Sequence, residues 1–305
     1  MQTGPDYSAM EGSRLRLRDG RALGYAEYGD AEGVPVFYFH GHPGSRLEGA
    51  LADSAARRLG VRLVGVDRPG MGHSDFHPGR GFLDWPATVV ELADALGFER
   101  FAVQGVSGGG PYALACAYTI PQRLRACGVV AGMGPIHELG IQGMLPVVRL
   151  HFTVARRARW LLRPLMWVYL GRFQGRSLDK RSFARLVARL SHGNDELAAS
   201  HELASGYLRE ILEAFRQGTR GPAYEARLYT RPWGFRLEKI ELPRVFLWHG
   251  ESDLHIPVRM GRAMAKSIPN CQARFFPGED HFTPVLRHLD EILTAMRKQV
   301  AVPPC

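Results

Sequence analysis

Short apolar runs and longer amphipathic segments alternate along the first third of the chain. Short, mainly apolar runs are typical of strands buried on both faces of a sheet, and they fall at residues 36–39, 62–66, 101–104 and 126–131. The amphipathic segments predict helices at residues 46–59, 85–96 and 111–117. A hairpin is predicted around Asp19-Gly20, between residues 14–17 and 22–28. This alternation predicts an α/β fold with a mostly parallel sheet and helices on both faces.

The alternation stops at Gly132-Met133-Gly134-Pro135, and helical patterns replace it as far as Pro232. These patterns predict helices at residues 145–170, 180–190 and 195–215. Strand patterns return at residues 244–248 and 273–276, and helices are expected at 258–266 and 286–299. We therefore predict an α/β core of residues 1–134 and 233–305, interrupted by an all-helical cap over residues 135–232.

The composition excludes a membrane-spanning protein and a disulfide scaffold. The 305 residues are 45% hydrophobic and 23% charged, which suits a globular domain with a sizeable core. No apolar run reaches the ~18 residues of a membrane-spanning helix, and residues 1–11 lack the apolar segment of a signal peptide. The four cysteines show no C-x-x-C spacing and are expected to be free thiols. These features predict a cytoplasmic protein.

The net charge of +9 is concentrated in the predicted cap. Residues 136–231 contain 16 arginines and lysines against 8 aspartates and glutamates. Such an excess suits three kinds of partner: nucleic acid, an anionic membrane surface or an acidic substrate. The arginines are spread over many helical turns, and no nucleic-acid-binding motif accompanies them. We therefore interpret them as a solvated helical face, and no nucleic-acid partner is predicted.

The segment Gly105-Val106-Ser107-Gly108-Gly109 has the G-x-S-x-G spacing of a nucleophile elbow. It lies between a predicted strand and a predicted helix. A serine on so sharp a turn needs small residues two positions before and after it, because larger side chains there would collide. Gly105 and Gly109 meet this need. The following helix would direct its N-terminal N–H groups at the same place, so Ser107 is the candidate nucleophile.

The ends of later strands supply an acid and a base. In open parallel sheets, functional sites form beyond the carboxyl ends of the strands. Ser107, Asp253 and His281 follow three predicted strands in that order. Serine is a weak nucleophile that needs a base within hydrogen-bond reach, and an imidazole base needs a carboxylate to orient it and to stabilise its charged form. We predict that His281 is the base and Asp253 its orienting acid.

Five segments at these strand ends resemble motifs of the α/β-hydrolase superfamily, and the resemblance extends over about residues 13–300. The segments are His40-Gly41-x-Pro43, Asp67-Arg68-Pro69-Gly70-x-Gly72-x-Ser74, the elbow, His249-Gly250-x-x-Asp253 and Asp280-His281-Phe282. The sequence HGHPGSR is most similar to that of the capped hydrolases in this superfamily. The resemblance implies the α/β-hydrolase fold, a catalytic triad of the three predicted residues, and an oxyanion hole formed by the backbone N–H groups of His42 and Gly108. The family often has a smaller residue at position 42, and we expect only the backbone of His42 to act.

Other polar residues compete for the same roles. The alternative acids, which are less well placed beyond a strand than Asp253, are Asp75, Asp84 and Glu251. The alternative bases, which we interpret as loop or packing residues, are His73, His249 and His255. Asp280 is interpreted as a structural loop residue, and Asp67-Arg68 as a source of structural hydrogen bonds below the site. His40 and His42 form an H-x-H pair, but no cluster of carboxylates or cysteines completes a metal site, so no metal and no cofactor are predicted.

A cap above the strand ends would form the substrate pocket. Aromatic residues of the cap are candidates for its apolar walls, among them Trp160, Trp167 and Tyr207. Cap arginines are candidates to meet a carboxylate on the substrate. Helical periodicity does not indicate which of these side chains face inward.

The leading hypothesis is a serine hydrolase that cleaves an ester, thioester or amide of a small or medium organic molecule through an acyl-enzyme. Carboxylesterase activity (EC 3.1.1) is favoured. An aminopeptidase resembling proline iminopeptidases would need an acidic group in the cap to bind an α-amine, and the basic cap counts against it. A carbon–carbon hydrolase, lyase or cyclase on the same scaffold and a non-catalytic ligand receptor are further alternatives. The sequence leaves a monomer and a homodimer open.

Overall fold

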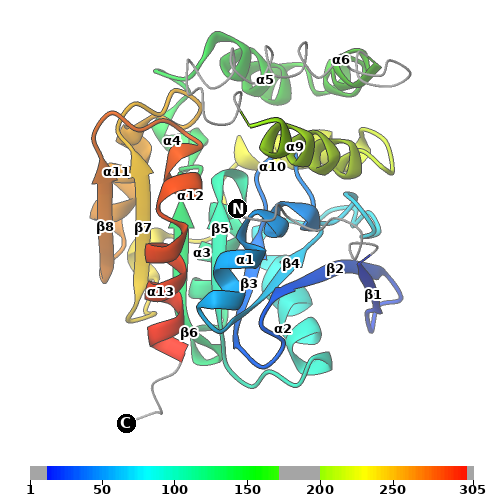
Figure 1. Ribbon diagram of the computed structural model, residues 1–305. Coiled ribbons are helices and arrows are strands. Elements are labelled where there is room, and N and C mark those ends of the chain that lie inside the picture. The colour runs from blue at the N-terminus through cyan, green and yellow to red at the C-terminus, as the bar shows by residue number, and fades with distance from the viewer. Residues whose placement is uncertain (1–11, 172–199, 301–305) are drawn as a thin grey trace.

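An eight-stranded sheet forms the centre of the computed structural model, which describes residues 12–171 and 200–300 (Figure 1). The strand order is β1-β2-β4-β3-β5-β6-β7-β8. The pairs β1–β2 and β2–β4 are antiparallel, and every other neighbouring pair is parallel. The strands are β1 Ser13–Arg16, β2 Ala22–Gly29, β3 Val34–Phe39, β4 Val61–Val66, β5 Phe101–Val106, β6 Leu124–Val130, β7 Val245–Gly250 and β8 Cys271–Phe276. The predicted mostly parallel sheet is confirmed.

The central strands are apolar throughout because each of their faces is covered. In β3, Phe37 and Phe39 pack into the core on one side of the sheet, and Val36 and Tyr38 pack into the core on the other. The first of these cores contains residues of α2 (Trp85–Ala95), α3 (Gly110–Thr119) and α11 (Val258–Ser267). The second contains residues of α1 (Asp53–Arg58) and α13 (Leu289–Val300). The helices therefore lie on both faces, as the strand–helix alternation predicts.

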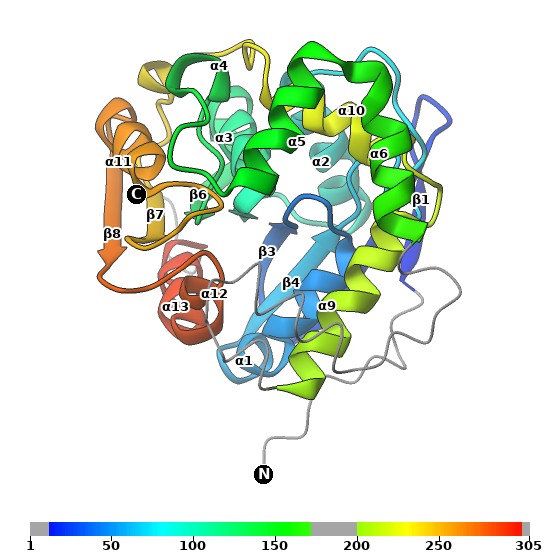
Figure 2. The same ribbon diagram turned by 90° about the horizontal axis from the view of Figure 1, so that it is seen from above.

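A helical insertion separates β6 from β7. Its described α-helices are α4 (Ile136–Leu139), α5 (Pro146–Arg157), α6 (Arg159–Gly171), α9 (His201–Ala214) and α10 (Arg220–Tyr229), and a 3-10 helix over Leu237–Lys239 follows them. Figure 1 shows α5, α6, α9 and α10 together above the sheet, and Figure 2 shows them from above. The described parts of residues 131–244 contain helices and no strand. The predicted helical cap is therefore confirmed as part of the fold. The exact domain boundaries stay predictions.

Two predicted helices are broken in the structure. The helix expected at 46–59 is a 3-10 helix over Arg46–Ala52 followed by α1, and the hydroxyl of Tyr28 donates to the Arg46 carbonyl at 3.0 Å. This contact comes from a distant strand, so local periodicity does not predict it. The helix expected at 145–170 is interrupted at Ala158, where α5 ends and α6 begins directly after it.

Two other helix predictions differ at the ends. The closing helix predicted at 286–299 consists of α12 (Thr283–Arg287) and α13, and the helix predicted at 195–215 is described from His201 onwards as α9. The helix predicted at 180–190 lies outside the described residues. Within the described chain, no helix is both long enough and apolar enough to cross a membrane.

Candidate active site

Ser107 occupies a strained turn directly beyond β5. Its φ angle is +50°, in the left-handed region that a residue with a side chain rarely adopts. A Cβ atom at position 105 would overlap the Gly109 carbonyl, and one at position 109 would overlap the Phe39 carbonyl. Glycine is therefore required on both sides of the turn, as the elbow motif predicts.

Of the three residues predicted to form a catalytic triad, His281 lies within hydrogen-bond distance of the other two. His281 Nε2 is 3.0 Å from Ser107 Oγ, and His281 Nδ1 is 2.7 Å from Asp253 Oδ2. Asp253 follows β7 and is fixed by two backbone N–H groups, those of His255 and Ile256, which each donate to its Oδ1 at 2.8 Å. His281 precedes α12 and is 8% exposed. The loops after three different strands thus bring a hydroxyl, an imidazole and a carboxylate together.

The electrostatics of the His281–Asp253 pair favour an imidazole that accepts a proton. Burial alone would lower the pKa of His281, but the adjacent Asp253 carboxylate and its hydrogen bond raise this pKa above the usual value. Burial alone would raise the pKa of Asp253, but His281, followed by His249, holds it well below the usual value. Asp253 is therefore ionised at neutral pH and stabilises a positive charge on His281.

The alternative bases occupy supporting positions rather than the place beside Ser107. His249 is fully buried, and its Nε2 lies 2.7 Å from the Ile256 carbonyl and 3.3 Å from Asp253 Oδ2. The ring of His255 stacks on that of His281, with 4.9 Å between the ring centroids. His249 therefore supports the carboxylate from behind, and His255 packs against the imidazole.

The described residues include one group with metal-ligand geometry, namely Asp253, His255 and His281. The Nδ1 atom of His281 and the Oδ2 atom of Asp253 already bond each other, and Oδ1 already accepts two N–H groups. A metal ion would have to break these bonds, so the donor set does not favour one. Asp280 accepts from the N–H groups of Phe282 and Thr283, which fits its interpretation as a loop residue.

The two residues predicted to supply oxyanion donors lie against each other. A Cβ atom added to Gly108 would lie 2.6 Å from the Cβ of His42 and 3.2 Å from its backbone nitrogen. The hydroxyl of Tyr229, from α10, donates to the Gly108 carbonyl at 2.9 Å. The loop after β3 and the residue that follows Ser107 are therefore in direct contact beneath the cap.

A buried ion pair that the sequence did not predict links the cap to the loop after β4 and, through His42, to the loop after β3. The Glu225 carboxylate, on α10, accepts hydrogen bonds from Arg68 Nε at 2.6 Å and from Arg68 Nη2 at 2.8 Å, and neither side chain is exposed. His42 Nδ1 lies 2.8 Å from Glu225 Oε2; because a carboxylate only accepts, this nitrogen carries a proton. Arg68 also donates to the carbonyls of His40 and Gly41. Arg68 therefore has the structural role that was predicted, and through Glu225 it also helps to hold the His42 side chain. In the sequence, Glu225 is distinguished only as a single acid between arginines.

Two acids, Glu48 of the 3-10 helix after β3 and Glu210 of the cap, lie next to each other. Glu48 accepts the Gly41 N–H at 2.6 Å and the Tyr38 hydroxyl at 2.7 Å. Glu210, on α9, is 3% exposed, and burial followed by the neighbouring Glu48 carboxylate raises its pKa well above the usual value. The cap therefore presents buried acids to the core although its net charge is positive. The argument from net charge against an acidic group beside the site is wrong at this position.

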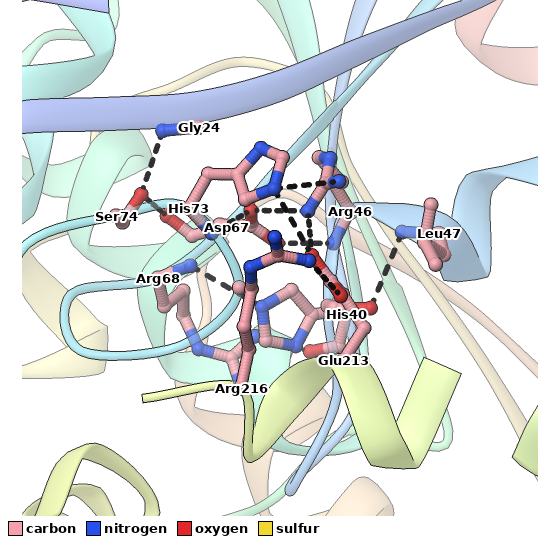
Figure 3. Close-up of polar contacts among 12 residues, drawn as sticks. Gly24, His40, Arg46, Leu47, Asp67, Arg68, His73, Ser74, Glu213 and Arg216 are labelled. Carbon is pink, nitrogen blue, oxygen red and sulfur yellow. Dashed lines mark hydrogen bonds and ion pairs between the residues drawn. The ribbon is translucent and has the colours of Figure 1, made fainter. Parts of the chain in front are cut away.

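Figure 3 shows a further connection between α9 and the core. Arg46 Nη1 lies 2.9 Å from Asp67 Oδ2 and 2.7 Å from Glu213 Oε1. The backbone N–H groups of Arg46 and His73 also donate to Asp67, which explains the structural role predicted for that residue. Glu213 is thus the second cap glutamate that pairs with an arginine of the core.

The cap aromatics differ from one another in position. Trp160 and Trp167 are 72% and 65% exposed on α6, where Leu162 and Met166 are the side chains that pack inward. These tryptophans are therefore not placed as pocket walls. The ring of Tyr207 packs against Phe282, next to His281, at 5.9 Å between centroids. Of the three candidates, Tyr207 is the one that lies near the site.

The fold and the site together define the class of protein. A mostly parallel sheet with a serine in a strained turn beyond a central strand, a helix behind that serine and an inserted helical cap is the architecture of α/β hydrolases. The family model of the alpha/beta hydrolase fold matches residues 34–286. The chain belongs to this family.

Individual relatives have varied functions. A 2-hydroxymuconate semialdehyde hydrolase from Pseudomonas putida is 25% identical over 277 residues, which is 87% of each chain. A proline iminopeptidase from Xylella fastidiosa (strain 9a5c) is 32% identical over 126 residues, 39% of each chain. Among solved structures, an esterase from Rhodococcus sp. ECU1013 superposes with a TM-score of 0.66 at 20% identity, covering 96% of this chain and 99% of that one. The similarity to the Rhodococcus esterase shows a shared fold.

Proposed function

We propose that this protein is a serine hydrolase that cleaves carboxylic esters of small or medium organic molecules through an acyl-enzyme. The observation that carries the proposal is the chain of hydrogen bonds from Ser107 Oγ through His281 to Asp253, at 3.0 and 2.7 Å. A hydroxyl, a base and an orienting carboxylate in this geometry are the parts that acyl transfer requires.

In the first half of the reaction, Ser107 Oγ attacks the acyl carbon and His281 Nε2 accepts the hydroxyl proton. Asp253 stabilises the imidazolium that forms. Negative charge develops on the former carbonyl oxygen, where the backbone N–H groups of Gly108 and His42 donate to it. The intermediate then collapses, His281 returns the proton to the departing alcohol, and the acyl group stays on Ser107.

In the second half, water replaces the alcohol. His281 removes a proton from the water as it attacks the acyl carbon, and the same N–H groups stabilise the second oxyanion. Collapse breaks the bond to Ser107 Oγ, His281 returns the proton to that oxygen, and the carboxylic acid is released. The raised pKa of His281 fits a base that works close to neutral pH.

The proposal is tested with a fluorophosphonate probe and a panel of p-nitrophenyl esters. We expect the intact mass of the wild-type protein to increase by one phosphonyl group, and Ser107→Ala to stay unlabelled. The esters, with acyl chains of increasing length, report the acyl preference. Turnover of the esters by a pure Ser107→Ala sample near the wild-type rate would contradict the proposal.

A second candidate is carbon–carbon bond hydrolysis, which the full-length similarity to the Pseudomonas putida enzyme favours. The molecule in that enzyme's name contains no ester or amide, so its hydrolysis breaks a carbon–carbon bond. Assaying 2-hydroxymuconate semialdehyde beside the esters decides between the two, since the true substrate class has the higher kcat/KM. Aminoacyl anilides in the same panel test the peptidase alternative, for which Glu210 is the buried acid that the cap supplies.

A further inference from the structure

The outer face of α5 and α6 is unusually apolar. Eleven large hydrophobic side chains are exposed among the described residues, and seven of them lie on these two helices. We refer to these seven as the cap face: Val147, Leu150, Trp160, Leu161, Leu165, Trp167 and Val168. Figure 1 shows α5 and α6 as the elements of the cap farthest from the sheet.

Helix α6 has apolar side chains on its exposed face as well as on its buried face. Leu162 and Met166, one turn apart, are buried against the cap core. Trp160, Pro164 and Trp167 follow the i, i+4, i+7 spacing of the opposite face. A surface helix of a globular protein normally turns polar residues outward. The inverted pattern of α6 indicates that its outer face meets something other than water.

The charges around this face all have one sign. The segment from Pro146 to Gly171 contains five arginines and no aspartate or glutamate. The arginines are all exposed, and they are Arg149, Arg156, Arg157, Arg159 and Arg163. A partner of the cap face must therefore accept tryptophan and leucine side chains and carry negative charge at the same place.

We propose that the cap face binds the surface of an anionic phospholipid membrane. Tryptophan and leucine side chains enter the boundary between headgroups and acyl chains, and arginines beside them attract anionic headgroups. The interaction is peripheral, since no described helix is long and apolar enough to span a bilayer. This proposal replaces the interpretation of these five arginines as a merely solvated face, and it does not depend on the reaction proposed for Ser107.

Two other partners fit the cap face less well. A symmetric dimer through this face would bring two copies of the same arginine-rich surface together, with no acid in the segment to pair with the arginines. Nucleic acid would match the charge, but its backbone offers no apolar surface for seven exposed hydrophobic side chains. An anionic membrane meets both requirements.

Vesicle flotation tests the proposal with the full chain. We expect binding to vesicles of phosphatidylcholine mixed with phosphatidylglycerol, little binding to phosphatidylcholine alone, and a decrease as salt is added. Trp160→Ser/Trp167→Ser and Arg156→Glu/Arg163→Glu should each weaken binding by about tenfold or more. The matched controls, Leu83→Ser/Tyr118→Ser and Arg100→Glu/Arg236→Glu, alter exposed residues elsewhere and should bind as the wild type does.

Each outcome decides the matter. If the wild-type protein binds neither kind of vesicle, or binds both kinds equally, the proposal is overturned without any variant. Dimerisation in sedimentation equilibrium that the Trp160→Ser/Trp167→Ser variant abolishes, with no vesicle binding, assigns the face to a second copy. Fluorophosphonate labelling is measured on every variant. Retained labelling shows that the site is folded, and it keeps failure of membrane binding separate from failure of the proposed chemistry.

Discussion

Replacing Glu225 with glutamine tests whether the cap holds the loop that carries His42. The change keeps the size of the side chain and removes its charge. Glu225 and Arg68 are both fully buried, and burial alone would raise the pKa of Glu225, whereas Arg68 holds it well below the usual value. After the substitution, Arg68 keeps the carbonyls of His40 and Gly41 and the ring of Tyr112 as neighbours, but it loses the carboxylate that balances its charge.

The expected loss of stability is large. Removing one partner of a buried pair costs about 3–5 kcal/mol of unfolding free energy, because a charge stays buried and unpaired. At roughly 2–4 °C per kcal/mol for a chain of this size, the Tm should fall by about 10 °C. Glu225 also orients His42, whose N–H is proposed to stabilise the oxyanion. A shift of this loop should lower kcat by about 100-fold and change KM less.

Thermal unfolding by circular dichroism and steady-state ester hydrolysis measure the two effects. The matched control is Glu213→Gln, since Glu213 also joins a cap helix to a core arginine. Arg46 would keep Asp67 at 2.9 Å, so we expect a loss of only about 1–2 kcal/mol and near-normal kcat. Glu225→Gln protein that melts and turns over as the wild type does would refute the reasoning. So would a control that is impaired equally.

Three further predictions concern the elbow and the base. Gly109→Ala should yield little folded protein, because its Cβ would overlap the Phe39 carbonyl, and soluble yield with circular dichroism measures this; a stable, active variant would contradict the strained turn. Ser107→Ala and His281→Ala should each reduce kcat by several orders of magnitude. The double variant should be no worse than either single variant, because the effects of substituting residues that act as one unit are not additive. Losses in kcat that multiply in the double variant would show that the two residues have separate roles. The neutral form of His281 is the base, and the pKa of His281 is raised above 6.5. The value of kcat/KM should therefore rise as the pH increases through that raised pKa. A pH–rate profile that falls over this range would exclude His281 as the base.

The fold was predictable where burial is strongest. The central strands are buried on both faces, so their apolar runs stand out in the sequence, as in Val36 to Phe39. The segment predicted as one helix at 46–59 is a 3-10 helix followed by α1, and its first carbonyl accepts a hydrogen bond from the Tyr28 hydroxyl of β2. Periodicity records which face of a segment is apolar, and it carries no information on contacts made from elsewhere in the chain.

The candidate site shows the same division. The motifs around Ser107 and His281 are local, and the loops after their strands meet because parallel strands end at one edge of the sheet. Glu225 and Glu210 belong to no motif, and a net-charge count sums charges without placing them. That count concealed the buried acids of the cap. The outward orientation of Trp160 was missed for a different reason, since periodicity does not indicate which apolar face of a cap helix is covered.

The proposed acyl-enzyme is tested most directly by measuring the mass of the Ser107 peptide during turnover. Wild-type protein is mixed with a p-nitrophenyl ester, quenched in acid within the steady state, and digested for peptide mass spectrometry. We expect the peptide containing Ser107 to gain the mass of the acyl group, and the corresponding peptide of Ser107→Ala to show no gain. Rapid turnover without an acyl group on that peptide, or with the acyl group on another residue, would contradict this expectation.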